Sequence, residues 1–124
     1  MTVTRITLHI VSKRNRRRAM ALLHTNTVLA RKAKGFVSRR VLFANDNALK
    51  GYSITTFETR KDMENFSANP DRPPLEFKGK DRQVYEKTAK GSILLFTHTQ
   101  SDLYEDVDVP RRKSRRARRK ARRS

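Results

Sequence analysis

Three histidines are the residues of this sequence best suited to acid–base or ligand chemistry. His9 and His98 each lie in a short apolar segment of alternating pattern, and His24 lies within an apolar helical pattern. A neutral imidazole accepts a proton near pH 7 and also binds metals or haem. If the two alternating segments are neighbouring strands, His9 and His98 could lie near each other. We therefore treat all three as candidate catalytic residues, against the alternative that they are unrelated structural histidines.

A second set of side chains could line a cavity for a flat organic ligand. The candidate pocket residues are Asn26, Tyr52, Phe57 and Phe96. The same aromatic residues would also serve as ordinary hydrophobic core, which is the alternative. The sequence shows no Ser-His-Asp grouping, glycine-rich phosphate loop or close carboxylate pair. It contains no cysteine, and its acidic stretch near the C-terminus lacks the spacing of a calcium loop, so no metal site is predicted.

The most basic part of the sequence is its C-terminal segment, residues 110–124. Its ten cations are Arg111, Arg112, Lys113, Arg115, Arg116, Arg118, Arg119, Lys120, Arg122 and Arg123. A segment of this composition cannot bury a core and is expected to be disordered in isolation. It is predicted to bind nucleic acid or another polyanion through phosphate contacts, with an affinity that falls as salt rises. The alternatives are a solubilising tail or a latch on the acidic residues before it. A smaller basic cluster lies at residues 13–18.

Length and composition limit the class of protein. The chain has 124 residues and a net charge of +18, so it has room for one small domain, predicted at residues 1–100. An acidic hinge is predicted at residues 101–109, before the polycationic tail. No segment reads as a signal peptide or approaches the length of a membrane span, and we expect a cytoplasmic protein.

Hydrophobic periodicity predicts the elements that must position these side chains. Alternation predicts strands at residues 4–11, 36–44, 51–58 and 92–99. Apolar spacings of three and four predict a helix from about residue 19 to 33, ended by Gly35, with Ser12 or Asn15 as its N-cap. A short helix is predicted at 59–66 with Thr59 as its cap, a proline-containing loop at 67–77, and a helical turn at 80–87.

The element order β-α-β-β-α-β predicts an α+β, ferredoxin-like antiparallel sheet. In this fold the strands lie in the order four, one, three, two, with both helices on one face. The other face, expected to carry side chains such as Val11, Phe57 or Phe96, then needs cover. A homodimer packed sheet to sheet would supply that cover.

Three segments resemble the antibiotic biosynthesis monooxygenase family. They are the long helix closed by Gly35-Phe36, the strand Tyr52-Ser53-Ile54-Thr55-Thr56-Phe57-Glu58, and the short helix Thr59-Arg60-Lys61-Asp62-Met63-Glu64-Asn65-Phe66. The resemblance implies a dimeric α/β barrel and either a cofactor-free oxygenase of polycyclic phenols or a haem-degrading enzyme. It thus implies either no cofactor or haem. The sequence departs from the family in having no Trp and in lacking the first-strand Asn that haem-degrading members use.

Together these features predict a monooxygenase-like homodimer acting on an aromatic or haem-like substrate, with a polyanion-binding tail. Two alternatives stay open. One is a nucleic-acid-binding ferredoxin-like module, with association with the ribosome as one option. The other is a dimeric scaffold without catalysis.

Overall fold

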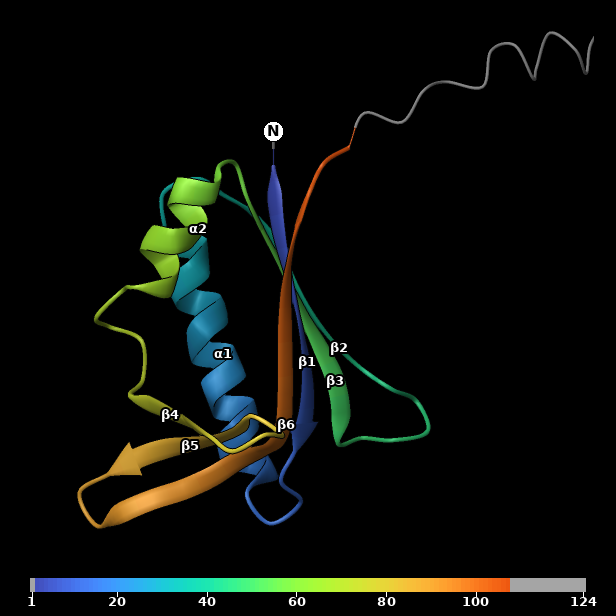
Figure 1. The fold of residues 1–124 in the computed structure, drawn as a ribbon, viewed down its shortest axis with the longest axis vertical. Coiled ribbons are helices and arrows are strands. Elements are labelled where there is room, and N and C mark those ends of the chain that lie inside the picture. The colour runs from blue at the N-terminus through green and yellow to red at the C-terminus, as the bar shows by residue number, and fades with distance from the viewer. Residues whose placement is uncertain (1, 108–124) are drawn as a thin grey trace, which may run out of the picture.

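The structure is a computed structural model, and it describes residues 2–107. Six strands and two helices follow one another along the chain. They are β1 (Val3–Val11), α1 (Arg16–Lys32), β2 (Phe36–Phe43), β3 (Lys50–Phe57), α2 (Arg60–Ser67), β4 (Leu75–Lys78), β5 (Gln83–Thr88) and β6 (Gly91–Glu105). Both helices lie on the same side of the sheet (Figure 1).

The strands form one antiparallel sheet in the order β2-β3-β1-β6-β5-β4. The predicted order four, one, three, two is therefore confirmed, because β6 is the fourth strand of the ferredoxin-like pattern and lies beside β1. The hairpin of β4 and β5 adds two strands beyond it. Long β6 bends around α1 and carries this hairpin under the helix (Figure 1).

The hairpin corrects two predictions. The helical turn predicted at 80–87 is wrong, because those residues form the turn and strand of a β-hairpin, and the loop predicted at 67–77 ends at β4. Gly79 has a φ of 78° in the connecting turn, a conformation that glycine adopts without strain. Val84 of β5 is buried against the core, whereas its neighbours are charged or polar, so the hairpin gives only a weak hydrophobic pattern.

The last strand is also longer than predicted. It begins at Gly91 and ends at Glu105, so the acidic hinge expected from residue 101 starts as part of the sheet. Its outer half pairs with β1 in continuous register, from Val3 opposite Glu105 to Ile10 opposite His98. This half was not predicted because most of its residues are polar and give no hydrophobic alternation. Backbone hydrogen bonds between strands form without apolar side chains.

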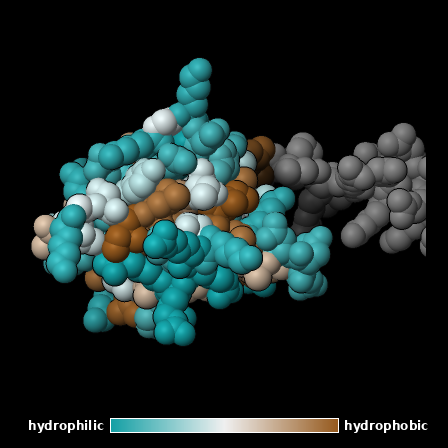
Figure 2. Space-filling model, turned by 90° about the horizontal axis from the view of Figure 1, so that it is seen from below, coloured by the Kyte–Doolittle hydropathy of each residue, from teal (hydrophilic) through white to brown (hydrophobic). Residues whose placement is uncertain are grey.

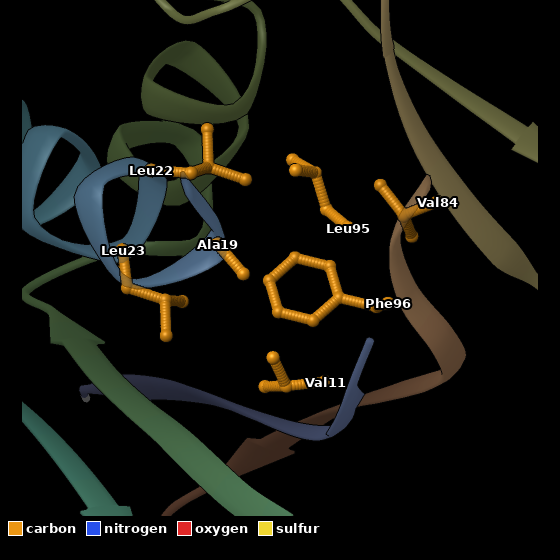
Figure 3. Close-up of a cluster of buried hydrophobic side chains, with 7 residues drawn as sticks. All are labelled: Val11, Ala19, Leu22, Leu23, Val84, Leu95 and Phe96. Atoms are coloured by element: carbon orange, nitrogen blue, oxygen red, sulfur yellow. The ribbon is translucent and has the colours of Figure 1, made fainter. Parts of the chain in front are cut away.

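The first core cluster lies between the start of α1 and the bent end of the sheet. Its seven buried residues are Val11, Ala19, Leu22, Leu23, Val84, Leu95 and Phe96. Figure 3 shows the helical side chains pointing at the ring of Phe96 and at Leu95, with Val11 closing the cluster from β1. The helical spacing of three and four places Ala19, Leu22 and Leu23 on this one face.

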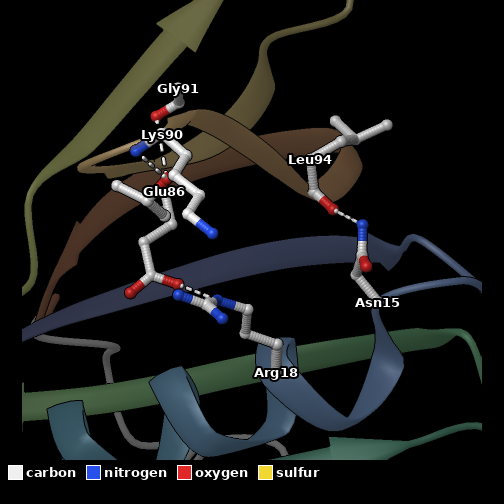
Figure 4. A network of polar contacts seen from close by, with 7 residues as sticks. Asn15, Arg18, Glu86, Lys90, Gly91 and Leu94 are labelled. Atoms are coloured by element: carbon white, nitrogen blue, oxygen red, sulfur yellow. Dashed lines mark hydrogen bonds and ion pairs between the residues drawn. The ribbon is translucent and has the colours of Figure 1, made fainter.

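Polar contacts fix the start of α1 to the hairpin. Asn15 occupies the N-cap position, but its side chain makes no capping bond; its Nδ2 donates to the Leu94 carbonyl at 2.8 Å instead. Arg18 Nε lies 2.6 Å from Glu86 Oε1 on β5. These two contacts tie the first turn of the helix to β5 and β6 (Figure 4). The first turn contains no acidic residue, so its basic side chains oppose the helix dipole.

A tight junction joins α1, β2 and α2. Gly35 follows the C-cap of α1 with a φ of 80°, and a Cβ at this position would collide with the carboxylate of Asp62. Glycine is therefore required here both for its conformation and for its size. Asp62 is held by the cap of α2, where its N–H donates to Thr59 Oγ1 at 3.1 Å.

The side chains expected on the uncovered face of the sheet lie on the helix-covered face instead. Val11, Phe57 and Phe96 lie under the helices, each at most 2% exposed, and not on the uncovered face. Alternation along β1 then points the side chains of even-numbered residues away from the helices. We define the open face by six such side chains on β1, β2 and β3: Ile6, Leu8, Ile10, Leu42, Tyr52 and Ile54.

Apolar surface therefore remains accessible. Leu42 and Tyr52 are each 40% exposed and Tyr104 of β6 is 51% exposed. Seen from the end at which α1 begins, a band of hydrophobic side chains crosses the molecule between polar ones (Figure 2). Within residues 2–107, neither helix has the length and apolar character needed to cross a membrane.

Candidate functional site: a pocket between the sheet and the helices

The helix-covered side of the sheet encloses a cavity of about 590 Å³. Strands β1, β2, β3 and β6 form its floor, and α1, α2 and the β4–β5 hairpin form its walls. This volume lies in the range of small-molecule sites. Its lining combines an apolar part with a cluster of polar groups. The apolar part includes Leu22, Leu23, Met63, Phe66, Leu75, Val84, Phe96 and Leu103, and the polar part includes Arg5, Thr7, His9, Asn26, Arg39, Ser53, Thr55, Ser67, Arg72, Thr99 and Ser101.

His9 lies on the floor of this pocket and is 7% exposed. Its Nε2 shares a 2.8 Å hydrogen bond with Ser53 Oγ on β3, and its ring lies 4.7 Å from the ring of Phe96, centre to centre. Neither its Nδ1 nor the hydroxyl of neighbouring Thr99 has a hydrogen-bond partner among the described residues. Buried polar atoms without partners are uncommon and often mark a site that a ligand or water completes.

The environment of His9 keeps the imidazole neutral at pH 7. Burial lowers its pKa first, and the positive charge of Arg39 lowers it further, to about 4. Both causes act against the imidazolium form, because burial removes its hydration and Arg39 repels it. The neutral ring therefore keeps one nitrogen lone pair that can accept a proton or a hydrogen bond.

Four arginines line the pocket. Arg82 is exposed, whereas Arg5, Arg39 and Arg72 are half-buried and come from three different segments; we call these three the arginine triad. Arg39 of β2 donates through Nε to Thr27 Oγ1 at 2.8 Å and through Nη1 to Thr55 Oγ1 at 2.7 Å. Arg5 of β1 donates through Nη1 to Ser67 Oγ at 2.8 Å.

Arg72, the third member, follows α2. It makes long 3.4 Å hydrogen bonds to Asn26 Oδ1 and to the Ser67 carbonyl. Its guanidinium carbon lies 4.9 Å from the centre of the Phe66 ring, the geometry of a cation–π contact. Neutral oxygens and an aromatic ring therefore hold all three guanidiniums in place.

The charge of the triad is not balanced by an ion pair among the described residues. Within the described part of the chain, no ion pair involves Arg5, Arg39 or Arg72. Burial lowers the pKa of all three, and mutual repulsion adds to it: Arg72 lowers the pKa of Arg39, which falls to about 10, and Arg5 lowers that of Arg72. All three stay protonated at pH 7. Asp102, the acidic member of the lining, is exposed on β6.

The structure separates the four predicted pocket residues. Asn26 and Phe96 line the cavity. Phe57 is completely buried in a second core cluster, packing against Phe36 and Phe66, and does not reach the cavity. Tyr52 lies on the open face, because β3 alternates and the neighbouring residues of Tyr52 face the helices.

It also separates the three candidate histidines. His9 lies opposite Thr99, so His98 is opposite Ile10 and its side chain points to the other face of the sheet. The expected His9–His98 pair is therefore not formed, although the two strands are neighbours. His24 is exposed on α1 and does not line the pocket. Among residues 2–107, no group of three metal-ligating side chains occurs.

The arginine triad is the part of the site that the sequence analysis missed. Its members are far apart in the chain, and arginine on a strand usually indicates a solvent-facing position. A usable signal existed nonetheless: Arg39 is in phase with Val41, and Arg5 is in phase with Val3 and Val11. The predicted polycationic tail lies outside the described residues.

Comparisons with known proteins place this fold. No protein-family model matches the chain, and no curated protein sequence matches it. The structure is similar to SnoaB from Streptomyces nogalater, a cofactor-independent oxygenase, with a TM-score of 0.62 and 12% sequence identity over 87% of this chain and 95% of that one. It is similar to Rv0793 from Mycobacterium tuberculosis, with a TM-score of 0.62 and 13% identity over 88% and 98%.

A third similar structure is described as an antibiotic biosynthesis monooxygenase, with a TM-score of 0.58 and 8% identity over 86% of this chain and 99% of that one. The chain has the antibiotic biosynthesis monooxygenase-like fold. The predicted ferredoxin-like α+β class and the family resemblance are thus confirmed at the level of fold. At identities of 8–13%, the monooxygenase-like fold alone does not fix the chemistry, which depends on the pocket described above.

Proposed function

We propose that this protein is a small oxygenase-type enzyme that binds an aromatic organic substrate in the pocket and uses His9 as its base. The observation that carries the proposal is a neutral, buried imidazole at the floor of a cavity whose lining combines apolar side chains with polar ones. Of the three histidines considered from the sequence, His9 alone lines this cavity. The similarity to SnoaB, a cofactor-independent oxygenase, supports the class of reaction.

The proposed chemistry begins with proton removal. With Nε2–H donated to Ser53, the lone pair on His9 Nδ1 accepts a proton from an activated methylene of the substrate. The resulting carbanion supplies electrons to dioxygen. For a methylene oxidised to a ketone, CH₂ and O₂ give C=O and H₂O, so the substrate is oxidised by four electrons and dioxygen is fully reduced. Ser53 positions the imidazole throughout.

The test uses 1,8-dihydroxy-9-anthrone, a tricyclic phenol with an activated methylene, and follows oxygen consumption and quinone absorbance. We expect His9→Gln, which retains a donor toward Ser53, to lower the enzyme-dependent rate by at least about 100-fold. His24→Gln is the matched control, because His24 is exposed on α1, and it should leave the rate unchanged. An equal rate in wild type and His9→Gln would exclude His9 as the base.

We further propose that the enzyme is a homodimer packed through the open face. The helices cover the other face, and the open face presents Ile6, Leu8 and Ile54 on adjacent central strands. A single-layer sheet with an apolar outer face requires cover. A second copy of the chain offers a surface of the same character, which suits an isologous interface.

The basic segments support a second proposal, contact with nucleic acid or another polyanion. The tail at residues 110–124 carries ten cations, and residues 13–18 at the start of α1 are mostly exposed and basic. Binding through such residues neutralises phosphates and weakens steeply with salt. Cytoplasmic location would bring the protein into contact with RNA.

A salt series on full-length protein and a 1–109 truncation tests this second proposal. We expect truncation to abolish binding to a single-stranded RNA, and the intact protein to lose affinity steadily with salt. Salt-resistant binding by 1–109 would instead mean that the folded domain recognises nucleic acid, and would favour a nucleic-acid-binding module over an oxygenase. If neither protein binds RNA, the tail has another role.

A further inference from the structure

We propose that the pocket selects an organic anion, whose apolar body lies against α1 and β6 and whose carboxylate or phosphate group is bound by the triad of Arg5, Arg39 and Arg72. This assignment rests on the proposed function, since it names the substrate class for the same pocket. It is carried by geometry and charge on the helix-covered face.

The first argument is the uncompensated charge. The three half-buried guanidiniums of the triad share one cavity with the exposed Arg82, and no carboxylate pairs with any of the four in the part of the chain that the structure describes. Buried charge is normally paired, because removal from water is costly. A cavity that keeps three cations together is therefore completed by an anion, in the way that a cluster of arginines binds carboxylates and phosphates elsewhere.

The second argument is the supply of hydrogen-bond donors. Each guanidinium has five N–H groups. Within residues 2–107, Arg5 donates through one nitrogen, and Arg39 and Arg72 donate through two each. The remaining N–H groups are available to a ligand, and the planar fork of arginine matches the oxygens of carboxylate and phosphate alike.

The third argument is preorganisation. Arg39 is fixed by two threonine hydroxyls at 2.7 and 2.8 Å, so its guanidinium is held before any ligand arrives. Arg72 lies against the Phe66 ring. These supports reduce the entropy that a ligand would otherwise lose in ordering long side chains.

The rest of the lining defines the body of the ligand. Leu22 and Leu23 of α1, Phe96 of β6 and Val84 of β5 line its apolar side. They belong to the buried cluster shown in Figure 3. Such a surface suits one or two fused aromatic rings. A volume of about 590 Å³ accommodates a molecule of that size together with its anionic group.

The anion would also adjust the catalytic base. The positive charge of Arg39 contributes to the low pKa of His9. An anion beside the triad offsets that charge, so the pKa of His9 should rise toward the pH at which a base is most effective. Substrate binding would then activate the imidazole.

The experiment measures binding, without turnover, by isothermal titration calorimetry on the full-length chain at physiological salt. The probes share one ring system: 1-naphthoate, 1-naphthyl phosphate and the neutral 1-naphthylmethanol. We expect one or both anions to bind at least about tenfold more tightly than the neutral probe. The stronger of the two anions identifies carboxylate or phosphate as the preferred group.

Two variants assign the binding to the triad. Arg39→Gln should weaken the preferred anion by at least about tenfold. Arg31→Gln removes the same charge from an exposed position on α1, leaves the basic tail intact, and should bind like wild type. Arg5→Gln is the second triad variant, to be used if Arg39→Gln does not fold by circular dichroism.

Three results would overturn the inference: no binding of either anion, equal binding of the neutral probe, or equal weakening by Arg39→Gln and Arg31→Gln. The experiments can contradict the ligand class and the proposed oxygenase function independently of each other. Anion binding with no oxygen consumption would leave the ligand class standing and contradict the oxygenase chemistry. Turnover of a neutral substrate with no anion binding would support the oxygenase chemistry and contradict the ligand class.

Discussion

In the middle of β1, the two faces of the sheet divide polar and apolar residues in the opposite sense to an ordinary amphipathic strand. The helix-covered side of β1 carries Arg5, Thr7 and His9, whereas its uncovered side carries Ile6 and Leu8. In a monomer with one core, the apolar side would be expected under the helices. The reversal agrees with the two proposals made above, a ligand site on the covered side and a dimer interface on the open face.

Hydrophobic packing at both ends of the pocket offsets the unfavourable free energy of burying these polar groups. Phe57, Met63 and Phe66 form one cluster near α2, and Leu95 and Phe96 belong to the other near the start of α1. The polar groups lie between these clusters. Stability should therefore depend on the two ends of the covered side, and ligand binding on its middle.

The largest expected effect distinguishes packing on the two faces of β3. Phe57→Ala removes a ring with no exposure, and we expect it to lower the free energy of unfolding by about 3–5 kcal/mol. Tyr52→Ala removes a ring that is 40% exposed on the open face, and should cost about 1 kcal/mol or less. Urea unfolding at low protein concentration provides both values. Similar losses for the two variants would contradict the assignment of faces.

The second effect concerns assembly. Leu8→Asp places a charge at the centre of the open face and should weaken the proposed dimer by at least about 100-fold, while the domain stays folded. Light scattering coupled to gel filtration measures the change. Thr25→Asp, on the exposed side of α1, is the control and should remain dimeric. A dimer that tolerates Leu8→Asp must use another surface.

The third effect is a dependence of the free energy of unfolding on pH, which arises from His9 on the helix-covered face. The pKa of His9 is lowered from 6.5 to about 4 by folding, so between these values the unfolded state binds the proton more readily. Stability contributed by the neutral ring is complete above pH 6.5 and is lost as pH falls toward 4, by about 3 kcal/mol.

Unfolding measured from pH 7 to pH 4 checks this. His9→Gln should lose less stability over that range than wild type, whereas His98→Gln, whose side chain lies on the opposite face, should follow wild type. If His9→Gln and wild type lose the same stability, the imidazole is not held neutral by its surroundings.

The smallest effect concerns repulsion within the triad. Arg72→Gln removes one of three like charges, and we expect it to raise the free energy of unfolding on the order of 0.5 kcal/mol at low salt. The difference from wild type should disappear at high salt, because screening weakens the repulsion. Arg31→Gln, outside the pocket, controls for net charge. A loss of stability in Arg72→Gln at low salt would mean that its hydrogen bonds outweigh the repulsion.

The fold was largely predictable because backbone alternation and helical spacing depend on neighbouring residues. The strands of the ferredoxin-like pattern, the Gly35 turn and the Thr59 cap all have local signals. The hairpin did not, because Val84 is its one fully buried residue and half of its edge strand is exposed. Periodicity also does not say which side of a strand faces the helices, and in the middle of β1 the more apolar side is the open one.

The site was predictable only in part, since it depends on which distant residues meet. His9, Asn26 and Phe96 could be chosen by residue type alone. The triad combines β1, β2 and the segment after α2, and its interpretation depends on the absence of an ion pair to it within residues 2–107. That absence is a property of the assembled pocket and cannot be read along the sequence.

The central claim is that ligands bind on the helix-covered side and not on the open face. Methyl-resolved NMR during a titration with 1-naphthoate tests it most directly, since leucines report on both sides. We predict that the methyl signals of Leu22 and Leu23, which line the pocket, shift with saturable binding while those of Leu8 and Leu42 stay in place. Shifts confined to Leu8 and Leu42 would place the binding site on the open face and contradict the account.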